Sequence, residues 1–304
     1  MNSINSKANR LSQNPWVAFL PEQFQPYAYL GRFDKPIGVW LLLAPCLWSI
    51  TLASYPGLPD GEILLLFFMG AFLMRAAGCA YNDLLDKTYD AQVQRTYTRP
   101  IASGQLLERQ GMLFLAFLLS VSLLILVQFN FFSIALGFTA LVFVMLYPLM
   151  KRITYWPQAF LGLTFNWGAL LGWAVIREEL SWVSILLYLA GIFWTLGYDT
   201  IYAHQDKEDD LRIGVKSSAL KLGKDTPQFL WVFYGFSILC FLGVGILSPL
   251  GALYYVAVLA CSIHFAWQIY TLDMQDPEDC LNKFKSNKWV GFMMFGGILF
   301  SQFI

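Results

Sequence analysis

Nine long apolar runs recur along the chain, and only short polar segments separate most of them. They cover about residues 37–54, 61–81, 112–128, 131–149, 157–176, 181–203, 228–248, 250–271 and 289–304. A helix needs about 20 mainly apolar residues to span a bilayer, and these runs are continuous rather than alternating, which favours helices over a β-barrel. The sequence therefore predicts an all-α polytopic membrane bundle of about nine transmembrane helices.

The composition supports one membrane domain. Only 13% of the residues are charged and 57% are hydrophobic, whereas a soluble globular chain has roughly 25% charged residues. We therefore predict a single transmembrane domain over residues 37–304, preceded by a cytoplasmic, interfacial segment at residues 1–36. In that segment aromatic side chains alternate with Glu22, Arg32 and Lys35, which is typical of an amphipathic segment on a bilayer surface.

The basic residues predict the orientation. Of the 20 lysines and arginines, 18 fall in segments on one predicted side of the membrane. The positive-inside rule assigns that side to the cytoplasm. The first 30 residues contain no short apolar region of the secretory type. The first 16 residues contain two basic residues and no acid; this faintly resembles a transit peptide, but the segment is short. We expect a bacterial cytoplasmic (inner) membrane, with the mitochondrial inner membrane as the alternative.

Two acid-rich clusters lie where apolar runs reach the predicted cytoplasmic side, at residues 82–90 and 199–210. On a helix, Asn82, Asp86 and Asp90 share one face, and Asp206 and Asp210 repeat the same spacing. Like charges at this spacing repel one another unless a cation neutralises them. Two such clusters facing one space would bind Mg²⁺ ions, which in turn bind a diphosphate. A solvated acidic face is the alternative interpretation for either cluster alone.

Basic residues on the same predicted side suit an anionic substrate. The candidates are Arg95, Arg99, Lys151, Arg152, Arg212 and Lys216. Arginine forks match phosphate oxygens and lysine supplies a point charge, although charge that sets membrane orientation explains any single one of them equally well. Arg75 differs because it lies inside an apolar run, where a charge is costly and marks function by default. It is expected to bind an anionic acceptor or to pair with an acid, with snorkelling to the interface as the alternative.

The sequence contains no motif typical of several other classes of enzyme or binding protein. There is no phosphate-binding glycine loop, no nucleophile elbow, no zinc-ligand spacing and no nucleic-acid-binding pattern. The five cysteines show no Cys-x-x-Cys spacing and are expected to be buried thiols. For Asn166, within an apolar run, an interhelical hydrogen bond is as good an explanation as a functional one. An ion-coupled transporter remains a rival hypothesis because intramembrane acids often mark transport paths, although the outer half lacks a matching polar path.

The two clusters and their flanks resemble the motifs of the UbiA-type membrane prenyltransferases. Residues 82–90 have the pattern N-D-x-x-D-x-x-x-D and continue into a similar stretch at 95–101. Residues 198–203, 206–210 and 214–217 resemble the second motif of the family. Residues 32–38 and 74–79 are similar to the 4-hydroxybenzoate polyprenyltransferase branch, which serves ubiquinone biosynthesis. The resemblance extends from about residue 25 to 300.

This resemblance implies helices around a central cavity and a defined reaction. A polyprenyl group would pass from polyprenyl diphosphate to the ring carbon ortho to the hydroxyl of 4-hydroxybenzoate, releasing diphosphate. The expected Mg²⁺ ligands are Asn82, Asp86, Asp206 and Asp210. The expected catalytic acids are Asp83, Asp86, Asp90, Asp199, Asp206 and Asp210. The expected substrate-binding residues are Arg75, Asn82, Arg95, Arg99, Lys151, Arg152, Arg212 and Lys216. Homogentisate, a naphthoate, a chlorophyllide or haem remain alternative acceptors. The lipid bilayer is expected as a further partner, no nucleic acid is expected, and protein partners stay open.

Overall fold

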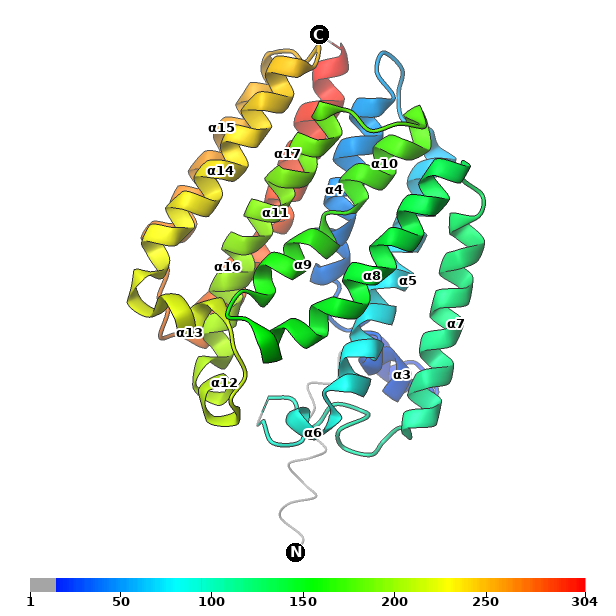
Figure 1. The fold of residues 1–304 in the computed structure, drawn as a ribbon, viewed down its shortest axis with the longest axis vertical. Helices are drawn as coiled ribbons and strands as arrows, with labels where there is room; N and C mark the ends of the chain where they lie inside the picture. Colours follow the sequence, from blue (N-terminus) through cyan, green and yellow to red (C-terminus); the bar gives the residue numbers. More distant parts are fainter. Residues whose placement is uncertain (1–14, 94, 304) are drawn as a thin grey trace, which may run out of the picture. The chain divides into compact units, whose positions relative to one another are not determined.

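The computed structural model describes residues 15–93 and 95–303, and every regular element in these ranges is a helix (Figure 1). Seven helical stretches of the described chain have the length and apolar composition to cross a membrane. The main helices are α4 (Ile37–Ala53), α5 (Gly61–Leu85), α7 (Glu108–Leu126), α8 (Phe131–Ile153), α9 (Pro157–Phe165), α10 (Gly168–Arg177), α11 (Trp182–Ala203), α14 (Thr226–Leu247), α15 (Ala252–Tyr270) and α17 (Lys288–Phe300).

The predicted all-α membrane bundle is confirmed, because each of the nine predicted runs contains helix. Two of these helices are short for a membrane span, since α4 has 17 residues and α17 has 13. Some helices end a few residues away from the predicted ends of the apolar runs, because polar residues continue the helix. Thus α5 extends to Leu85, four residues beyond the predicted apolar run, because its backbone groups continue to pair inside the helix.

The chain divides into two compact units, residues 1–38 with 72–124, and residues 39–71 with 125–304. The single domain predicted for residues 37–304 stays a prediction. Unit 1 contains α2 (Pro15–Ala18), α3 (Gln25–Leu30), the C-terminal part of α5, α6 (Lys87–Asp90) and nearly all of α7. Ala80 of α5 packs with Leu30, Ile101 and Leu106 in its core. A small side chain at this position lets other segments approach the helix closely.

Part of the predicted interfacial segment falls on residues 1–14, which lie outside the described residues. Within the described part, α2 and α3 are short helices with exposed aromatic side chains between them. Phe19 is 88% exposed and Phe24 is 52% exposed. Aromatic side chains exposed this far suit a segment that lies against a membrane surface.

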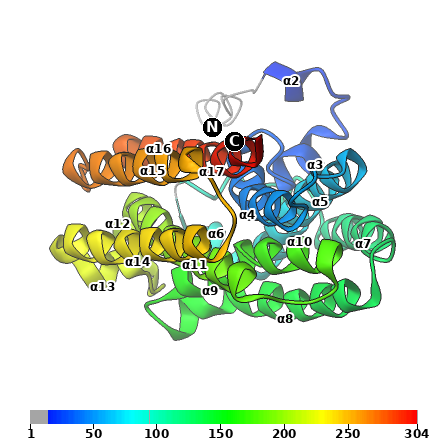
Figure 2. The ribbon, with the colours of Figure 1, turned by 90° about the horizontal axis from the view of Figure 1, so that it is seen from above.

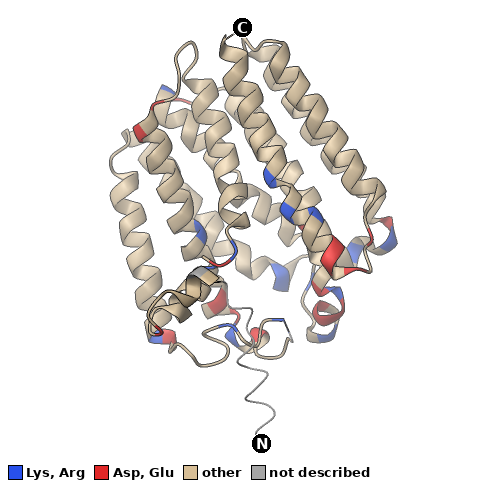
Figure 3. Cartoon of the chain, turned by 180° about the vertical axis from the view of Figure 1, so that it is seen from behind, with Lys and Arg blue, Asp and Glu red and all other residues tan. Residues whose placement is uncertain are grey.

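Unit 2 is a layered helical bundle. Helix α14 packs against α11 and α15, and α15 packs against α17 (Figure 2). Short helices follow the long ones: α12 (Lys207–Ile213), α13 (Ser218–Leu222) and α16 (Pro277–Ser286). Buried hydrogen bonds tie them in, since Thr200 Oγ1 lies 2.7 Å from Ser218 Oγ and the Ser218 amide donates to Gln158 Oε1. Figure 3 shows most charged residues at helix ends and in the connecting segments, as a bilayer requires.

A break in the fifth predicted span has a specific cause. One helix was predicted for residues 157–176, but α9 ends at Phe165 and α10 begins at Gly168. Between them, Asn166 Nδ2 donates to the carbonyl of Gly162 and to Thr195 Oγ1 of α11, both at 2.8 Å. The interhelical hydrogen bond, one of the two explanations left open for Asn166, is therefore present. Irregular backbone at membrane depth is tolerated where protein buries it, and Asn166 is fully buried.

Gly191 makes room for this break. A Cβ at Gly191 would lie 2.1 Å from Asn166 Oδ1 and 2.9 Å from Asn166 Cβ. We expect Gly191→Ala to lower the free energy of unfolding by about 1–3 kcal/mol, because overpacking a buried contact forces side chains and backbone to shift. Thermal unfolding of the purified protein in detergent measures this effect. Gly235→Ala is the control, since nothing lies within 4 Å of its added Cβ; equal losses in both variants would contradict the explanation.

Candidate active site

The first acidic cluster follows the end of α5. Asn82 and Asp83 lie in its last turn, Asp86 precedes α6, and Asp90 ends α6. Helical backbone bonds nevertheless connect the cluster, because the Asp86 amide donates to the Asn82 carbonyl at 2.9 Å and the Asp90 amide donates to the Asp86 carbonyl at 2.8 Å. Asp83, Asp86 and Asp90 are all buried, with exposed fractions of 1%, 0% and 6%. The predicted helical spacing of the cluster is thus present in the backbone.

Two arginines bind two of these acids, and we name Arg32, Asp83, Asp90 and Arg99 the arginine–aspartate cluster. Arg32 Nη2 donates to both carboxylate oxygens of Asp83, each at 2.9 Å. Arg99 Nη1 donates to both oxygens of Asp90 at 2.9 and 2.8 Å, and to Asp83 Oδ1 at 3.1 Å. Arg32 was not among the predicted site residues, although it was noted in the segment 32–38. Ion pairing accounts for the burial of Asp83 and Asp90.

The charges of this cluster and of neighbouring residues alter the pKa of its members. Burial raises the pKa of Asp90, with Arg99 opposing this effect and Asp83 and Asp86 adding to it. Burial alone would lower the pKa of Arg32, but the carboxylate of Asp83 raises it above its ordinary value. Arg32 therefore stays charged, while Asp90 experiences two neighbouring carboxylates. A further cation near Asp86 would relieve this repulsion.

Arg75 lies in α5, one turn before Cys79. Its Nη1 donates to the sulfur of Cys79. Its guanidinium occupies the space beside Gly38, where an added Cβ would lie 2.2 Å from Arg75 Nε. Arg75 also lies close enough to Arg32 for its charge to lower the pKa of Arg32. Arg75 therefore lies beside the arginine–aspartate cluster within unit 1.

The second acidic cluster is carried by three consecutive helical segments. Asp199 lies in α11, Asp206 ends the short 3₁₀ turn His204–Asp206, and Asp210 lies in α12. All three side chains are half-buried. Helix α12 stops at Gly214, whose φ of 73° lets its amide donate to the carbonyl of Asp210, a common way for a helix to end. Asp206 and Asp210 therefore flank the first turn of α12.

The basic candidates of unit 2 separate into two groups. Arg212 is exposed and pairs with Asp209 one turn earlier. Lys216 instead joins the end of α8, because its amide donates to the Lys151 carbonyl at 2.8 Å and its Nζ donates to the Ile153 carbonyl at 3.0 Å. The ammonium of Lys216 also lies 5.5 Å from the centroid of the Tyr155 ring. Lys151 is half-buried and Arg152 is exposed beside it.

Helix α16 packs against the second motif, a contact that the sequence did not predict. The Phe284 ring lies 5.6 Å from the Tyr198 ring and 4.4 Å from the Tyr202 ring. Gln205 Nε2 donates to the Pro277 carbonyl at 2.8 Å. Tyr198 precedes Asp199, and Gln205 precedes Asp206, so α16 helps to hold both acids in place. A polar loop between two apolar runs gives no sign of such a contact.

The donor atoms fit a hard divalent cation that keeps part of its water. No group of three or more His, Cys, Asp or Glu side chains that could hold a metal occurs within residues 15–93 and 95–303. Asp83 and Asp90 are bound by arginines, and Asn82 and Asp86 are the further oxygen-bearing side chains of the first cluster. Mg²⁺ is usually bound through one or two carboxylates, several waters and substrate phosphates. Arg95, a predicted substrate-binding residue, is exposed and lies in the loop after α6.

These features define a multi-pass helical membrane protein with acidic and basic side chains concentrated where its helices end. The model of the UbiA prenyltransferase family matches residues 42–296, and the chain belongs to this family. Three similar proteins are named mitochondrial 4-hydroxybenzoate polyprenyltransferase. The human protein is 52% identical over 95% of this chain and 78% of its own length. The Caenorhabditis elegans and Arabidopsis thaliana proteins are each 51% identical, over 95% and 94% of this chain and 82% and 71% of their own lengths.

Solved structures support the fold. A UbiA homolog from Aeropyrum pernix K1 without ligand has a TM-score of 0.73 at 21% identity, covering 86% of this chain and 97% of its own. A UbiA homolog from Archaeoglobus fulgidus, described as bound to GPP and Mg²⁺, has a TM-score of 0.67 at 15% identity, covering 90% of this chain and 99% of its own. At these identities the similarity concerns the fold alone.

Proposed function

We propose that this membrane protein transfers a polyprenyl group from polyprenyl diphosphate to 4-hydroxybenzoate. The observation that carries the proposal is the identity of about one half to proteins named for this activity, over more than nine-tenths of the chain. Both acidic motifs are present, and in unit 1 ordered arginines surround the first of them. We propose that the reaction serves ubiquinone biosynthesis, as the resemblance in the sequence implies.

The reaction requires a leaving group to be stabilised and a cation to be protected from water. The bond between the prenyl carbon and the diphosphate oxygen breaks, and its electron pair stays on the diphosphate. The ring carbon ortho to the hydroxyl forms the new carbon–carbon bond and loses its proton. Arg95, Arg99, Lys151, Arg152, Arg212 and Lys216 are proposed to bind the diphosphate. Fixed positive groups of this kind act where charge develops in the transition state.

We assign the Mg²⁺ ligands to Asn82 and Asp86 of the first motif and to Asp206 and Asp210 of the second. When bound, Mg²⁺ supplies positive charge that stabilises the departing diphosphate. Asp83 and Asp90 take a different role, because they hold Arg32 and Arg99 in place. Asp199 is proposed to orient the acceptor. The proposal gains support from the Archaeoglobus fulgidus relatives, described as bound to GPP and Mg²⁺ or to DMAPP and Mg²⁺.

The test is an assay of membranes that contain this protein, supplied with a polyprenyl diphosphate, 4-hydroxybenzoate and Mg²⁺, with an EDTA control. We expect metal-dependent formation of 3-polyprenyl-4-hydroxybenzoate. If product forms with homogentisate or a naphthoate but not with 4-hydroxybenzoate, the protein is still a prenyltransferase of this family, but the proposed acceptor is wrong. No transfer to any acceptor by correctly inserted protein would favour the transporter hypothesis.

The compartment of this membrane protein belongs to the proposal as well. The relatives are named mitochondrial, which supports the mitochondrial inner membrane. The bacterial membrane favoured by the sequence analysis gains no support from them. Fluorescence localisation of the tagged protein in the cells that produce it distinguishes the two compartments.

Arg75 is proposed to bind the carboxylate of the aromatic acceptor. We expect Arg75→Ala to raise the KM for 4-hydroxybenzoate by about tenfold or more, as loss of a charge-assisted hydrogen bond would, with little change in the KM for the prenyl diphosphate. Gly38→Ala should show the same pattern, because its Cβ would displace the Arg75 guanidinium. Gly78→Ala is the matched control, since its added Cβ meets nothing within 4 Å. An unchanged acceptor KM in Arg75→Ala would refute this role.

A further inference from the structure

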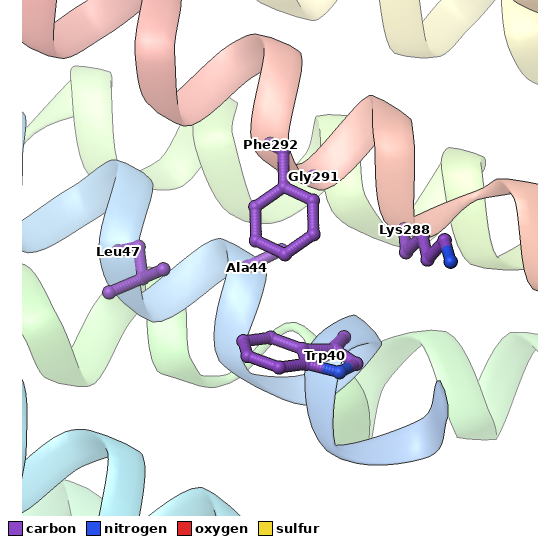
Figure 4. A pocket seen from close by; sticks show the side chains of 6 residues that line it. All are labelled: Trp40, Ala44, Leu47, Lys288, Gly291 and Phe292. Carbon is purple, nitrogen blue, oxygen red and sulfur yellow. The ribbon is translucent and has the colours of Figure 1, made fainter. Parts of the chain in front are cut away.

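A small pocket lies between α4 and α17 in unit 2, and none of its residues belongs to the acidic motifs. The space between its side chains is about 200 Å³, a volume that includes the part open to the surroundings, and Figure 4 shows the lining side chains on the two helices. Its lining consists of Trp40, Ala44, Leu47, Lys288, Gly291 and Phe292. The side chains of Trp40 and Phe292 pack with ring centroids 5.3 Å apart. Both helices are apolar, as expected of helices that lie in a bilayer.

The two ends of the pocket differ in chemistry. Figure 4 shows the Trp40 indole nitrogen and the Lys288 ammonium toward one end, with Ala44 and Leu47 toward the other. The indole N–H of Trp40 makes no hydrogen bond to another described residue. One end of the pocket therefore offers two hydrogen-bond donors, one of them charged, and the remainder offers an apolar surface.

Lys288 lacks an acidic partner within the described residues, and its ammonium lies 5.1 Å from the Trp289 ring centroid. The acids of the preceding helix do not neutralise it. Helix α16 has Glu278 and Asp279 in its first turn, whereas the charged residues of its last turn, next to α17, are both lysines. Asp279 already pairs with Lys283 at 2.7 Å. A helix of 10 residues is about 15 Å long, so the acidic end of α16 is remote from the pocket.

We propose that this pocket binds an anionic membrane phospholipid. Its phosphate would accept hydrogen bonds from Lys288 and Trp40, and the start of one acyl chain would lie on Ala44, Leu47 and Phe292. Basic pockets between membrane helices bind anionic lipid headgroups, and tryptophan and lysine concentrate at the level of those headgroups. A free phosphate would leave the apolar surface unused, and an uncharged lipid would leave the ammonium without a counter-ion. Trp289 and Phe292, 55% and 37% exposed, extend the lipid-facing surface.

Native mass spectrometry of the full-length protein in detergent, titrated with phosphatidylglycerol or phosphatidylcholine, tests this site. We expect one saturable phosphatidylglycerol, and no equivalent phosphatidylcholine. Lys288→Gln should weaken the binding of phosphatidylglycerol about tenfold, as loss of a charge-assisted contact would, and Lys288→Arg should retain it. Lys285→Gln is the matched control, because this exposed lysine does not line the pocket. Leu47→Phe, which fills the apolar end, should weaken binding while it leaves every charge in place.

Three outcomes would overturn the proposal. If Lys288→Gln binds phosphatidylglycerol as tightly as the unaltered protein, the lipid does not bind at this pocket. An equal loss in Lys285→Gln would show only a general effect of charge. Complete displacement of the lipid by farnesyl diphosphate, with a raised KM for the prenyl donor in Lys288→Gln, would assign the pocket to the substrate instead. The lipid titration needs neither substrate, so its result does not depend on the proposed reaction.

Discussion

Asp86→Ala and Asp206→Ala are each expected to abolish turnover while the protein still inserts into the membrane. Each replacement removes one proposed Mg²⁺ ligand, and with it part of the positive charge that opposes the leaving diphosphate. Loss of a single group that stabilises transition-state charge costs about 10²–10³ in rate, and loss of a metal ligand should cost at least as much. The measurement is product formation per inserted protein, over a range of Mg²⁺ concentrations.

Matched controls separate this effect from a general loss of acidic charge. Glu62 and Asp225 are exposed acids, one at the start of α5 and one before α14. Glu62→Ala and Asp225→Ala should retain nearly full activity. Near wild-type turnover in Asp86→Ala would remove the first motif from the proposed metal site, and the same result in Asp206→Ala would remove the second.

Arg99→Ala is expected to destabilise the protein by about 3–5 kcal/mol, because removing one partner of a buried ion pair leaves the other charge uncompensated. Asp83 and Asp90 are nearly inaccessible, and Arg99 bonds to both. The free energy of unfolding in detergent, compared between variant and unaltered protein, measures the loss. Arg99 also belongs to the proposed diphosphate site, so stability and activity must be measured separately.

Two further variants identify the cause of that loss. Asp90→Asn, added to Arg99→Ala, removes one uncompensated charge and should recover part of the stability, as a double-mutant cycle would show. Lys87→Ala breaks an exposed ion pair with Glu108, whose side chains are 46% and 57% exposed, and should cost only about 0.2–1 kcal/mol. Similar losses in Arg99→Ala and Lys87→Ala would disprove the importance of the buried arginine–aspartate cluster.

The sequence predicted the helical membrane architecture because long apolar runs leave a chain few alternatives in a bilayer. It also predicted the backbone of the first acidic cluster, where Asn82, Asp86 and Asp90 follow helical spacing. The break at Asn166 was not predictable, since the apolar pattern continues across it. That break depends on Thr195 and Gly191, which approach Asn166 only in the folded protein.

The partners of the charged residues likewise required the tertiary structure. Asp83 and Asp86 look alike in the sequence, yet Asp83 is bonded to Arg32, which is 51 positions away. Phe284 of α16 contacts the second motif although it lies more than 80 positions later in the chain than Tyr202. The sequence by itself determined the class of fold, the family and the residue types available for metal and phosphate binding, because apolar length and local spacing encode them. The tertiary structure decided that Asp83 and Asp90 are bonded to Arg32 and Arg99, because ion pairs depend on distances between side chains in the folded protein.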